Sequence, residues 1–289
     1  MELTEDLHSQ WNAIIIDILR EFIKICEENN LTYYCIYGTA IGAIRHQSII
    51  PWDDDIDISM PRPDFDKFVD ICSKNDMGDY ELITPHNTPN YPFYFYKFCL
   101  RNTTILEHKD IPYVIGMYID IFPLDGTADD INEAYRLMRK YKKINNRLMA
   151  ISTHNSFIEY MSLLLTPKHW GRFVYKTIGL FCRRQYRNYL LNKMDTICKL
   201  HNFDNAKYVI QYDGVYGRRD IFPKKWFHGT KTFLFEGMNV NLPFCYDNYL
   251  RQIYNDYMQL PPEDQRKYHH DKVYFNLNKR VSLSDIKYE

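Results

Sequence analysis

Four aspartates within five consecutive positions constrain the fold of this chain more than any other feature. They are Asp53, Asp54, Asp55 and Asp57, and isoleucines at positions 56 and 58 are interleaved with the last of them. If residues 55–58 form a strand, Asp53, Asp55 and Asp57 share one face while the isoleucines enter a core. A row of like charges that is partly buried must take up protons or bind a cation.

Every candidate ligand in this run is an oxygen, which favours a hard divalent cation such as Mg²⁺ or Mn²⁺. A solvated acidic loop is the plainer alternative, but it needs neither the preceding Pro51-Trp52 nor the interleaved isoleucines. An EF-hand calcium loop is excluded because Ile58 takes the position that requires glycine. The Asp-x-Asp pair of a metal-dependent glycosyltransferase remains an alternative.

The residues just before the acidic run predict a strand over 33–37, a turn at Gly38-Thr39 and a short helix over 40–45. A glycine and a hydroxyl residue at such a turn let backbone N–H groups and the helix N-terminus approach a phosphate. Many turns share this pattern, so its value comes from its position beside the acidic run.

Residues 93–101 predict a second strand that carries basic side chains. Lys97 and Arg101 are separated by an even number of positions, so the pattern places them on one face. Two cations on a strand that is otherwise apolar need anionic partners, and either a diphosphate or the acidic run itself would supply them.

Residues 114–125 predict a third strand with a single carboxylate among apolar side chains. Asp120 stands between two isoleucines, where burial is costly unless something compensates the charge. We expect Asp120 to be a third metal ligand that also accepts the proton of an attacking hydroxyl, with a buried loop-capping aspartate as the alternative. Asp125 is expected in a turn before Gly126.

Together these segments resemble the signature of the LicD family, whose relatives include fukutin-type proteins. The matching stretches are Gly38-Thr39, Ile41-Gly42-Ala43-Ile44-Arg45-His46 and Ile50-Pro51-Trp52-Asp53-Asp54-Asp55-Ile56-Asp57-Ile58. The family is similar in fold to nucleotidyltransferases, which pair a glycine turn with an Asp-x-Asp strand and a third carboxylate on a neighbouring strand. Its members transfer a phosphorylated alcohol from a CDP-linked donor to a glycan hydroxyl.

The resemblance implies an α+β (mixed α/β) fold with a nucleotidyltransferase-like core sheet, flanking helices and an added helical region. We expect one LicD-type catalytic domain over residues 1–289, with the core sheet at about 31–127 and 206–245 and a helical insertion at about 128–205. The aromatic, proline and acidic residues of the C-terminal third also resemble the family pattern. His269-His270 is expected to be a surface or substrate contact, because adjacent histidines in a strand face opposite ways.

The implied reaction moves a phosphorylated alcohol, best matched by phosphocholine from CDP-choline, onto a hydroxyl of a lipopolysaccharide, teichoic acid or capsule precursor and releases CMP. A nucleotidyltransferase or a glycosyltransferase that uses a nucleotide sugar is the alternative. The 25 tyrosines fit a choline ligand, since quaternary ammonium groups bind aromatic faces. The implied residues are Asp55, Asp57 and Asp120 for catalysis, Asp53, Asp55, Asp57 and Asp120 for Mg²⁺ or Mn²⁺, and Gly38, Thr39, Arg45, Lys97 and Arg101 for the donor.

Charge and cysteine content bound the cellular context. The chain has 36 Lys and Arg against 37 Asp and Glu, so its net charge gives no reason to expect a nucleic-acid partner. Seven cysteines without a CxxC pair indicate reduced, mostly buried thiols in a cytoplasmic protein. The first 22 residues predict an amphipathic helix and not a signal peptide.

No stretch of the sequence reaches the roughly 20 apolar residues that span a bilayer. Residues 135–148 and the cluster Arg183, Arg184 and Arg187 are strongly basic. They fit either peripheral contact with the inner face of a membrane or with a charged glycolipid, or ordinary solvated helix faces.

Overall fold

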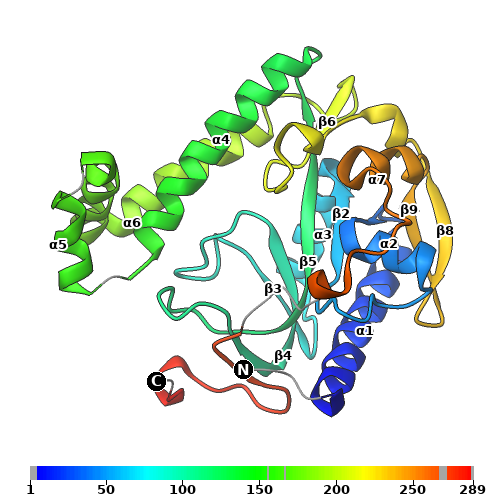
Figure 1. The fold of residues 1–289 in the computed structure, drawn as a ribbon, viewed down its shortest axis with the longest axis horizontal. Coiled ribbons are helices and arrows are strands. Elements are labelled where there is room, and N and C mark those ends of the chain that lie inside the picture. Colours follow the sequence, from blue (N-terminus) through cyan, green and yellow to red (C-terminus); the bar gives the residue numbers. More distant parts are fainter. Residues whose placement is uncertain (1–4, 155, 166, 267–271, 288–289) are drawn as a thin grey trace.

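A curled, mixed β-sheet with helices around it makes the α+β fold that the sequence predicts (Figure 1). The computed structural model describes residues 5–154, 156–165, 167–266 and 272–287. The main sheet follows the order β1-β2-β5-β4-β10, with β3 beside β4 and the pair β6-β7 beside β5. Its strands are β1 (Tyr34–Cys35), β2 (Asp57–Pro61), β3 (Tyr80–Ile83), β4 (Tyr96–Leu106), β5 (Ile115–Thr127), β6 (Tyr208–Ile210), β7 (Ile221–Pro223) and β10 (Tyr274–Asn276).

Strand β5 organises this sheet because every one of its 13 residues is buried. It pairs in parallel with β2 and antiparallel with β4 and β6. A strand with neighbours on both edges and cover on both faces has a nearly continuous apolar sequence, which explains the run from Ile115 to Leu124. The same register places Asp120 beside Asp57 on one neighbour and beside Lys97 on the other.

Seven α-helices occupy the described residues and fall into two groups. Helices α1, α2, α3 and α7 pack around the sheet, whereas α4, α5 and α6 extend away from it (Figure 1). The amphipathic N-terminal helix is present, with Trp11, Ile15 and Phe22 buried in the core. The helices are α1 (Glu5–Glu28), α2 (Tyr37–Arg45), α3 (Arg62–Lys74), α4 (Ile131–Ser152), α5 (Phe157–Leu165), α6 (Trp170–Cys198) and α7 (Tyr246–Tyr254).

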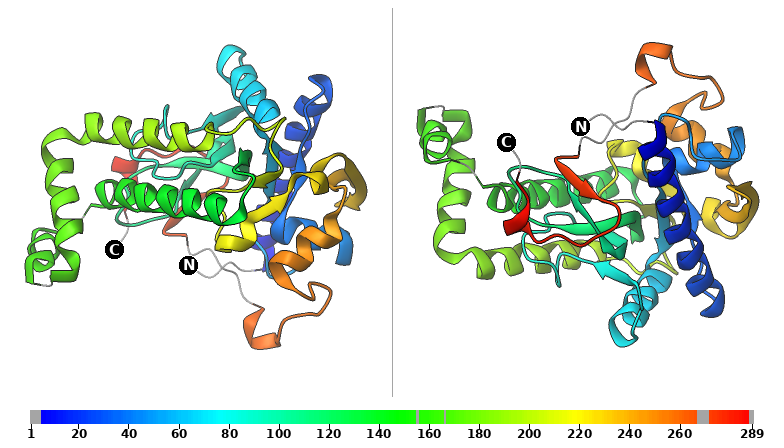
Figure 2. Two further views of the ribbon diagram at one scale, coloured as in Figure 1. Left: turned by 90° about the horizontal axis from the view of Figure 1, so that it is seen from above. Right: turned by 90° about the horizontal axis from the view of Figure 1, so that it is seen from below.

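Helices α4 and α6 form a two-helix arm around a second apolar core, which also includes Ile210 of β6 and Ile221 of β7. Met138 and Leu148 of α4 and Leu190 and Met194 of α6 are all buried in this core. At Cys182 the backbone of α6 leaves helical geometry (φ −135°, ψ 36°), and the helix bends there. The views in Figure 2 show α5 and the first part of α6 at the far end of the arm.

The strand boundaries differ from the predictions in several places. Strand β2 begins at Asp57, so Asp55 lies in the preceding loop, and the strand predicted over 93–101 begins at Tyr96 and continues to Leu106 with a register shift. Within 206–245, β8 (Thr230–Phe235) and β9 (Met238–Pro243) make a separate hairpin, while β10, beyond that range, joins the main sheet.

The prediction that Asp125 lies in a turn is wrong. The residue lies in β5, fully buried, where Arg62 donates hydrogen bonds of 2.6 and 3.0 Å to its two carboxylate oxygens. Such a bidentate pair supplies the compensation that a buried carboxylate needs. Sequence position alone did not distinguish this aspartate from a turn residue, because its partner is 63 positions away.

Two further expectations concern the cysteines and the membrane. All seven cysteines are free, and four of them are buried, as predicted. Within the described part of the chain, no helix combines the length and the apolar character that crossing a bilayer requires. His269-His270 lies outside the described residues.

Candidate active site

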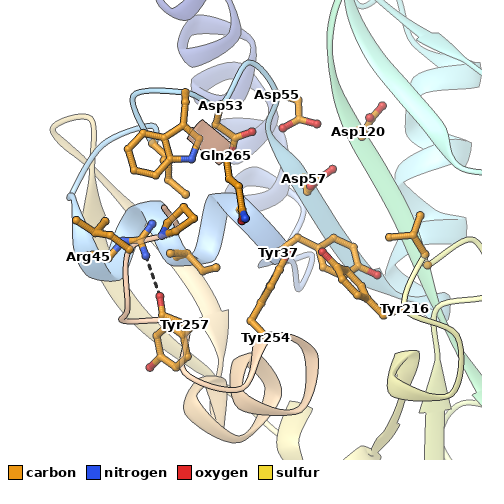
Figure 3. A pocket seen from close by; sticks show the side chains of 18 of the residues that line it. Tyr37, Arg45, Asp53, Asp55, Asp57, Asp120, Tyr216, Tyr254, Tyr257 and Gln265 are labelled. Carbon is orange, nitrogen blue, oxygen red and sulfur yellow. Dashed lines mark hydrogen bonds between the residues drawn. The ribbon is translucent and has the colours of Figure 1, made fainter. Parts of the chain in front are cut away.

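Three aspartate carboxylates from different segments converge where the start of β2 lies beside the middle of β5. Asp57 and Asp120 are direct neighbours in the parallel pairing, so their side chains lie on the same face of the sheet. Asp55 reaches the same point from the loop before β2 (Figure 3). Oxygen atoms of Asp55, Asp57 and Asp120 all lie within 4.8 Å of one another, a spacing that one metal ion can bridge.

The loop that carries the first aspartates is irregular but well anchored. The indole N–H of Trp11 donates to the carbonyl of Asp54 at 2.8 Å, which ties the loop to helix α1. At the strand itself, the backbone N–H of Asp57 donates to the hydroxyl oxygen of Thr39 at 2.9 Å. The backbone N–H of Asp120 donates to the carbonyl of Ile56 at 2.9 Å. These hydrogen bonds hold the backbone that carries the carboxylates in place, although residue 55 is not part of a strand.

Gly38 leaves room for the acidic loop. A Cβ atom at this position would lie less than 3.0 Å from Oδ2 of Asp53, so a larger residue would displace that carboxylate. Asp53, Asp54 and Asp55 form a second group whose oxygens approach within 4.8 Å. The prediction of a turn at Gly38-Thr39 is wrong, because both residues lie in the first turn of helix α2, where Gly38 makes room for the carboxylate of Asp53.

The pKa values of these carboxyl groups show how crowded the negative charge is. Burial, reinforced by Asp55 and Asp120, raises the pKa of Asp57 well above its usual range. Burial and the neighbouring Asp55 raise the pKa of Asp53 to about 9. Burial raises the pKa of Asp120 to about 6, although Lys97 opposes the shift. The cluster therefore lacks the positive charge that full ionisation needs, and a divalent cation would provide it.

Lys97 lies behind Asp120 and not in front of it. Its ammonium is 2.9 Å from Oδ1 of Asp120 and 3.5 Å from Oε1 of Glu107, and it sits 3.3 Å from the centre of the Tyr118 ring. Burial alone would raise the pKa of Glu107, but Lys97 and Lys272 lower it to about 2. Lys97 therefore belongs to a buried network of ion pairs that orients Asp120.

A cavity of about 710 Å³ opens in front of the three aspartates. Seven of its 24 lining residues are aromatic, and the rings of Tyr37, Tyr216 and Tyr254 follow one another along one side (Figure 3). The ring centres of Tyr37 and Tyr216 are 5.7 Å apart, and those of Tyr216 and Tyr254 are 5.3 Å apart. Phe95 and Phe122, stacked at 4.7 Å, contribute to the lining near Asp120.

The polar end of Tyr37 is held away from this cavity. Its hydroxyl donates to Gln211 at 2.7 Å and lies 3.1 Å from a carboxylate oxygen of Asp220, which in turn accepts the N–H of Tyr216 at 2.7 Å. Asp220 thus holds the hydroxyl of Tyr37 and the backbone of Tyr216. Tyr37 therefore presents its ring rather than its hydroxyl to the cavity.

The five residues expected to contact the donor do not all meet in the cavity. Gly38 and Arg45 line it, and Arg45 also donates to the carbonyl of Tyr257 at 2.9 Å (Figure 3). Thr39 is buried beneath Asp57, and Lys97 lies behind Asp120. Arg101 is exposed and donates to the carbonyl of Tyr80 at 2.8 Å, so the structure does not place it with Lys97 at the site.

Several lining residues were not identified from the sequence. They come mostly from the C-terminal third and include Trp52, Asp213, Tyr216, Tyr254, Tyr257 and Gln265. These positions fall in loops and at the end of a short helix, where no periodicity marks a side chain as facing a cavity. The adjacent Asp213-Gly214 after a strand was the one local signal that a turn enters this region.

Comparison with known proteins gives consistent similarities over most of the chain. A family model described as LicD/FKTN/FKRP, nucleotidyltransferase domain, matches residues 30–144. The lipopolysaccharide cholinephosphotransferase LicD of Haemophilus influenzae is 30% identical over 269 residues, which cover 89% of this chain and 93% of that protein. An uncharacterized protein of Rickettsia prowazekii is 38% identical over 187 residues, covering 53% of this chain and 66% of the relative.

Proposed function

This chain belongs to the LicD family, and from that premise we propose that it transfers phosphocholine from CDP-choline to a lipopolysaccharide hydroxyl and releases CMP. The Haemophilus relative, similar over 93% of its length, is named as a transferase of this kind. The observation that carries the proposal is the cluster of Asp55, Asp57 and Asp120 at the end of an aromatic cavity. We also propose that the sheet around this cluster is a nucleotidyltransferase-like core within one catalytic domain.

The aspartate cluster fits a divalent cation in its chemistry. All of its ligands are oxygens, which suit Mg²⁺ or Mn²⁺, and the pKa of Asp57, raised by burial and then by Asp55 and Asp120, indicates uncompensated negative charge. We assign Asp55, Asp57 and Asp120 as the main ligands and Asp53 as a supporting one. When bound, the cation would neutralise the donor diphosphate and the charge that develops during transfer.

Residues at the cavity mouth can hold the donor phosphates. Arg45 is the one Lys or Arg among the described residues that line the cavity, so it is our candidate for direct contact with the diphosphate. Gly38 lines the same cavity, where a Cβ atom would meet the carboxylate of Asp53. Lys97 acts indirectly in this proposal, because its ammonium orients Asp120 from behind.

Asp120 is also suited to accept a proton from the acceptor hydroxyl. Its carboxylate lines the cavity, and in the ionised form its oxygens can take up a proton from a hydroxyl bound there. Loss of this proton converts the sugar hydroxyl into the nucleophile that attacks the phosphorus of the phosphocholine group. The bond to CMP breaks as the new phosphodiester bond forms.

The aromatic wall supports the proposal that choline is the alcohol of the donor. A quaternary ammonium group has no hydrogen to donate, and it binds to ring faces with about 0.5–2 kcal/mol per ring. Tyr37, Tyr216 and Tyr254 present such faces because their rings lie side by side along the cavity. Glycerol or ribitol would gain little from these faces and would miss the hydrogen bonds that their hydroxyls require.

The test is a transfer assay with purified protein. CDP-choline and a lipopolysaccharide oligosaccharide that lacks phosphocholine are incubated with Mg²⁺, with Mn²⁺ or with EDTA, and CMP and modified glycan are quantified by mass spectrometry. We expect both products only with metal. Asp57→Asn should abolish them, whereas Asp256→Asn, on the same cavity but outside the cluster, should not.

A donor panel separates this proposal from its rivals. CDP-choline, CDP-ethanolamine, CDP-glycerol and CDP-ribitol are titrated by calorimetry in the presence of Mg²⁺, with CDP-choline expected to bind best. Binding of a different CDP-alcohol would replace choline as the substrate. Consumption of a nucleoside triphosphate or a nucleotide sugar, with every CDP-alcohol ignored, would overturn the assigned reaction.

A further inference from the structure

The first part of helix α6 exposes a stripe of large apolar side chains. Trp170, Val174, Ile178 and Phe181 follow one another at intervals of four, four and three residues, which places them on one face of the helix. Trp170 is 56% exposed and Phe181 is 84% exposed. A surface helix normally turns such a stripe toward the core, and this one does not.

Helix α5 adds to the same surface without covering it. Tyr160 of α5 stacks on Phe173 of α6 with ring centres 4.9 Å apart, and its hydroxyl shares a 2.6 Å hydrogen bond with Thr177. The two helices therefore pack through other faces, while Ile158 and Leu165 of α5 remain more than three-quarters exposed. Nine of the sixteen large exposed apolar side chains in the described residues lie between positions 158 and 181.

The bend in α6 places this apolar surface at an extremity of the molecule. Beyond Cys182 the helix runs back along α4, whereas before it the helix lies across the end of the arm (Figure 2). The sheet, with the strands β2 and β5 that carry Asp57 and Asp120, lies at the opposite end of the arm (Figure 1). Nothing in the catalytic proposal uses this surface.

Positively charged residues are concentrated in the same part of the chain as the exposed apolar side chains. Residues 134–188 contain twelve of the chain's 36 Lys and Arg but one of its 37 Asp and Glu. Lys168, Arg172 and Arg184 are exposed in or next to the apolar helices. The chain as a whole is nearly neutral, so the positive charge is concentrated on this arm.

We propose that the tip formed by α5 and residues 170–181 of α6 docks on the surface of an anionic phospholipid bilayer. The stripe enters the boundary between headgroups and acyl chains, and the flanking cations meet lipid phosphates. A second copy of this chain is a poorer occupant, because two such tips would bring their positive charges together. The tip therefore holds the enzyme at a membrane surface while its aspartate cluster remains in water.

The primary test is sedimentation with vesicles. Full-length protein is mixed with phosphatidylcholine vesicles with or without phosphatidylglycerol, and we expect co-sedimentation only with the anionic lipid. The variant Trp170→Ser/Val174→Ser/Phe181→Ser should bind on the order of 100-fold more weakly. The matched control Leu200→Ser/Leu234→Ser removes two exposed apolar side chains elsewhere and should bind like wild type.

The charge contribution is tested separately. Lys168→Glu/Arg172→Glu should lower vesicle affinity by at least about tenfold, since each cation near an anionic surface contributes roughly 1 kcal/mol. Lys67→Glu/Lys74→Glu, on exposed positions of α3, is the control with the same change in net charge. In wild type, vesicle binding should shift tryptophan emission to the blue, and Trp170→Phe should remove the shift while binding persists.

The other outcomes overturn the inference. Equal binding by the stripe variant and wild type would mean that this tip is not the contact. A lipid-independent dimer that the stripe variant abolishes would mean that the tip is a self-association surface. Release of CMP with a soluble oligosaccharide should be the same in all of these variants, so a failure of membrane binding is distinguishable from a failure of the proposed chemistry.

Discussion

Gly38→Ala separates the catalytic role of the acidic loop from its role in folding. The added methyl group would lie less than 3.0 Å from Oδ2 of Asp53, while the Cγ atom is 3.5 Å away, so the carboxylate rather than the backbone must move. Moving one side chain to an unfavourable rotamer costs about 1 kcal/mol, which corresponds to a decrease of roughly 2–4 °C in Tm for a chain of this size.

The same displacement should affect turnover far more than stability. A shift of about 1 Å in a group that positions reacting atoms can reduce the rate on the order of 100-fold. We therefore expect Gly38→Ala to remain folded by circular dichroism and thermal melting but to lose about 99% of its transferase activity, with a higher Mg²⁺ requirement.

Gly171→Ala is the matched control for this substitution. It lies in α6, where the nearest atom to a new Cβ is 3.9 Å away, and alanine there should raise helix stability slightly without changing turnover. Wild-type activity and metal dependence in Gly38→Ala would refute the assignment of Asp53 and its loop to the site.

Three other substitutions test the residues around the cluster. Lys97→Met leaves Asp120 buried without its cation and should lower the free energy of unfolding in urea by about 3 kcal/mol or more. Burial raises the pKa of Asp220 from 3.8 to about 6, so its contribution to stability is complete below about pH 4 and is lost as the pH rises to 6. Between pH 4 and pH 6, the free energy of unfolding measured in urea should therefore fall by about 3 kcal/mol less in Asp220→Asn than in wild type. Thr39→Val leaves the N–H of Asp57 without an acceptor and should cost about 1–3 kcal/mol in unfolding free energy, measured in the same way.

The centre of the site was accessible from the sequence because it depends on strand periodicity. Asp57 and Asp120 each follow apolar neighbours in a pattern typical of strands, and two buried strands with lone carboxylates favour adjacent positions in one sheet. The structure pairs these two residues directly. The carboxylate of Asp55 also lies at this point, although residues 53–55 form a loop and not a strand.

The remainder of the site depends on contacts between distant segments, which no local pattern specifies. Lys97 was expected to face the donor, but its register opposite Asp120 and the carboxylate of Glu107 bind it behind the cluster. Two of the three tyrosines of the aromatic wall lie beyond residue 210, with Tyr216 in a loop and Tyr254 at the end of helix α7. Tyr216 and Tyr254 meet Tyr37 through tertiary packing alone.

Binding of Mn²⁺ to the protein without nucleotide tests the central claim most directly. Calorimetry and electron paramagnetic resonance should detect Mn²⁺ binding by wild type and by Asp256→Asn, but not by Asp57→Asn. Because burial and like charges raise the pKa of Asp57, the asparagine variant should melt at the same or a higher temperature than metal-free wild type, which shows that it is folded. Unchanged Mn²⁺ affinity in folded Asp57→Asn would contradict a metal site formed by Asp55, Asp57 and Asp120.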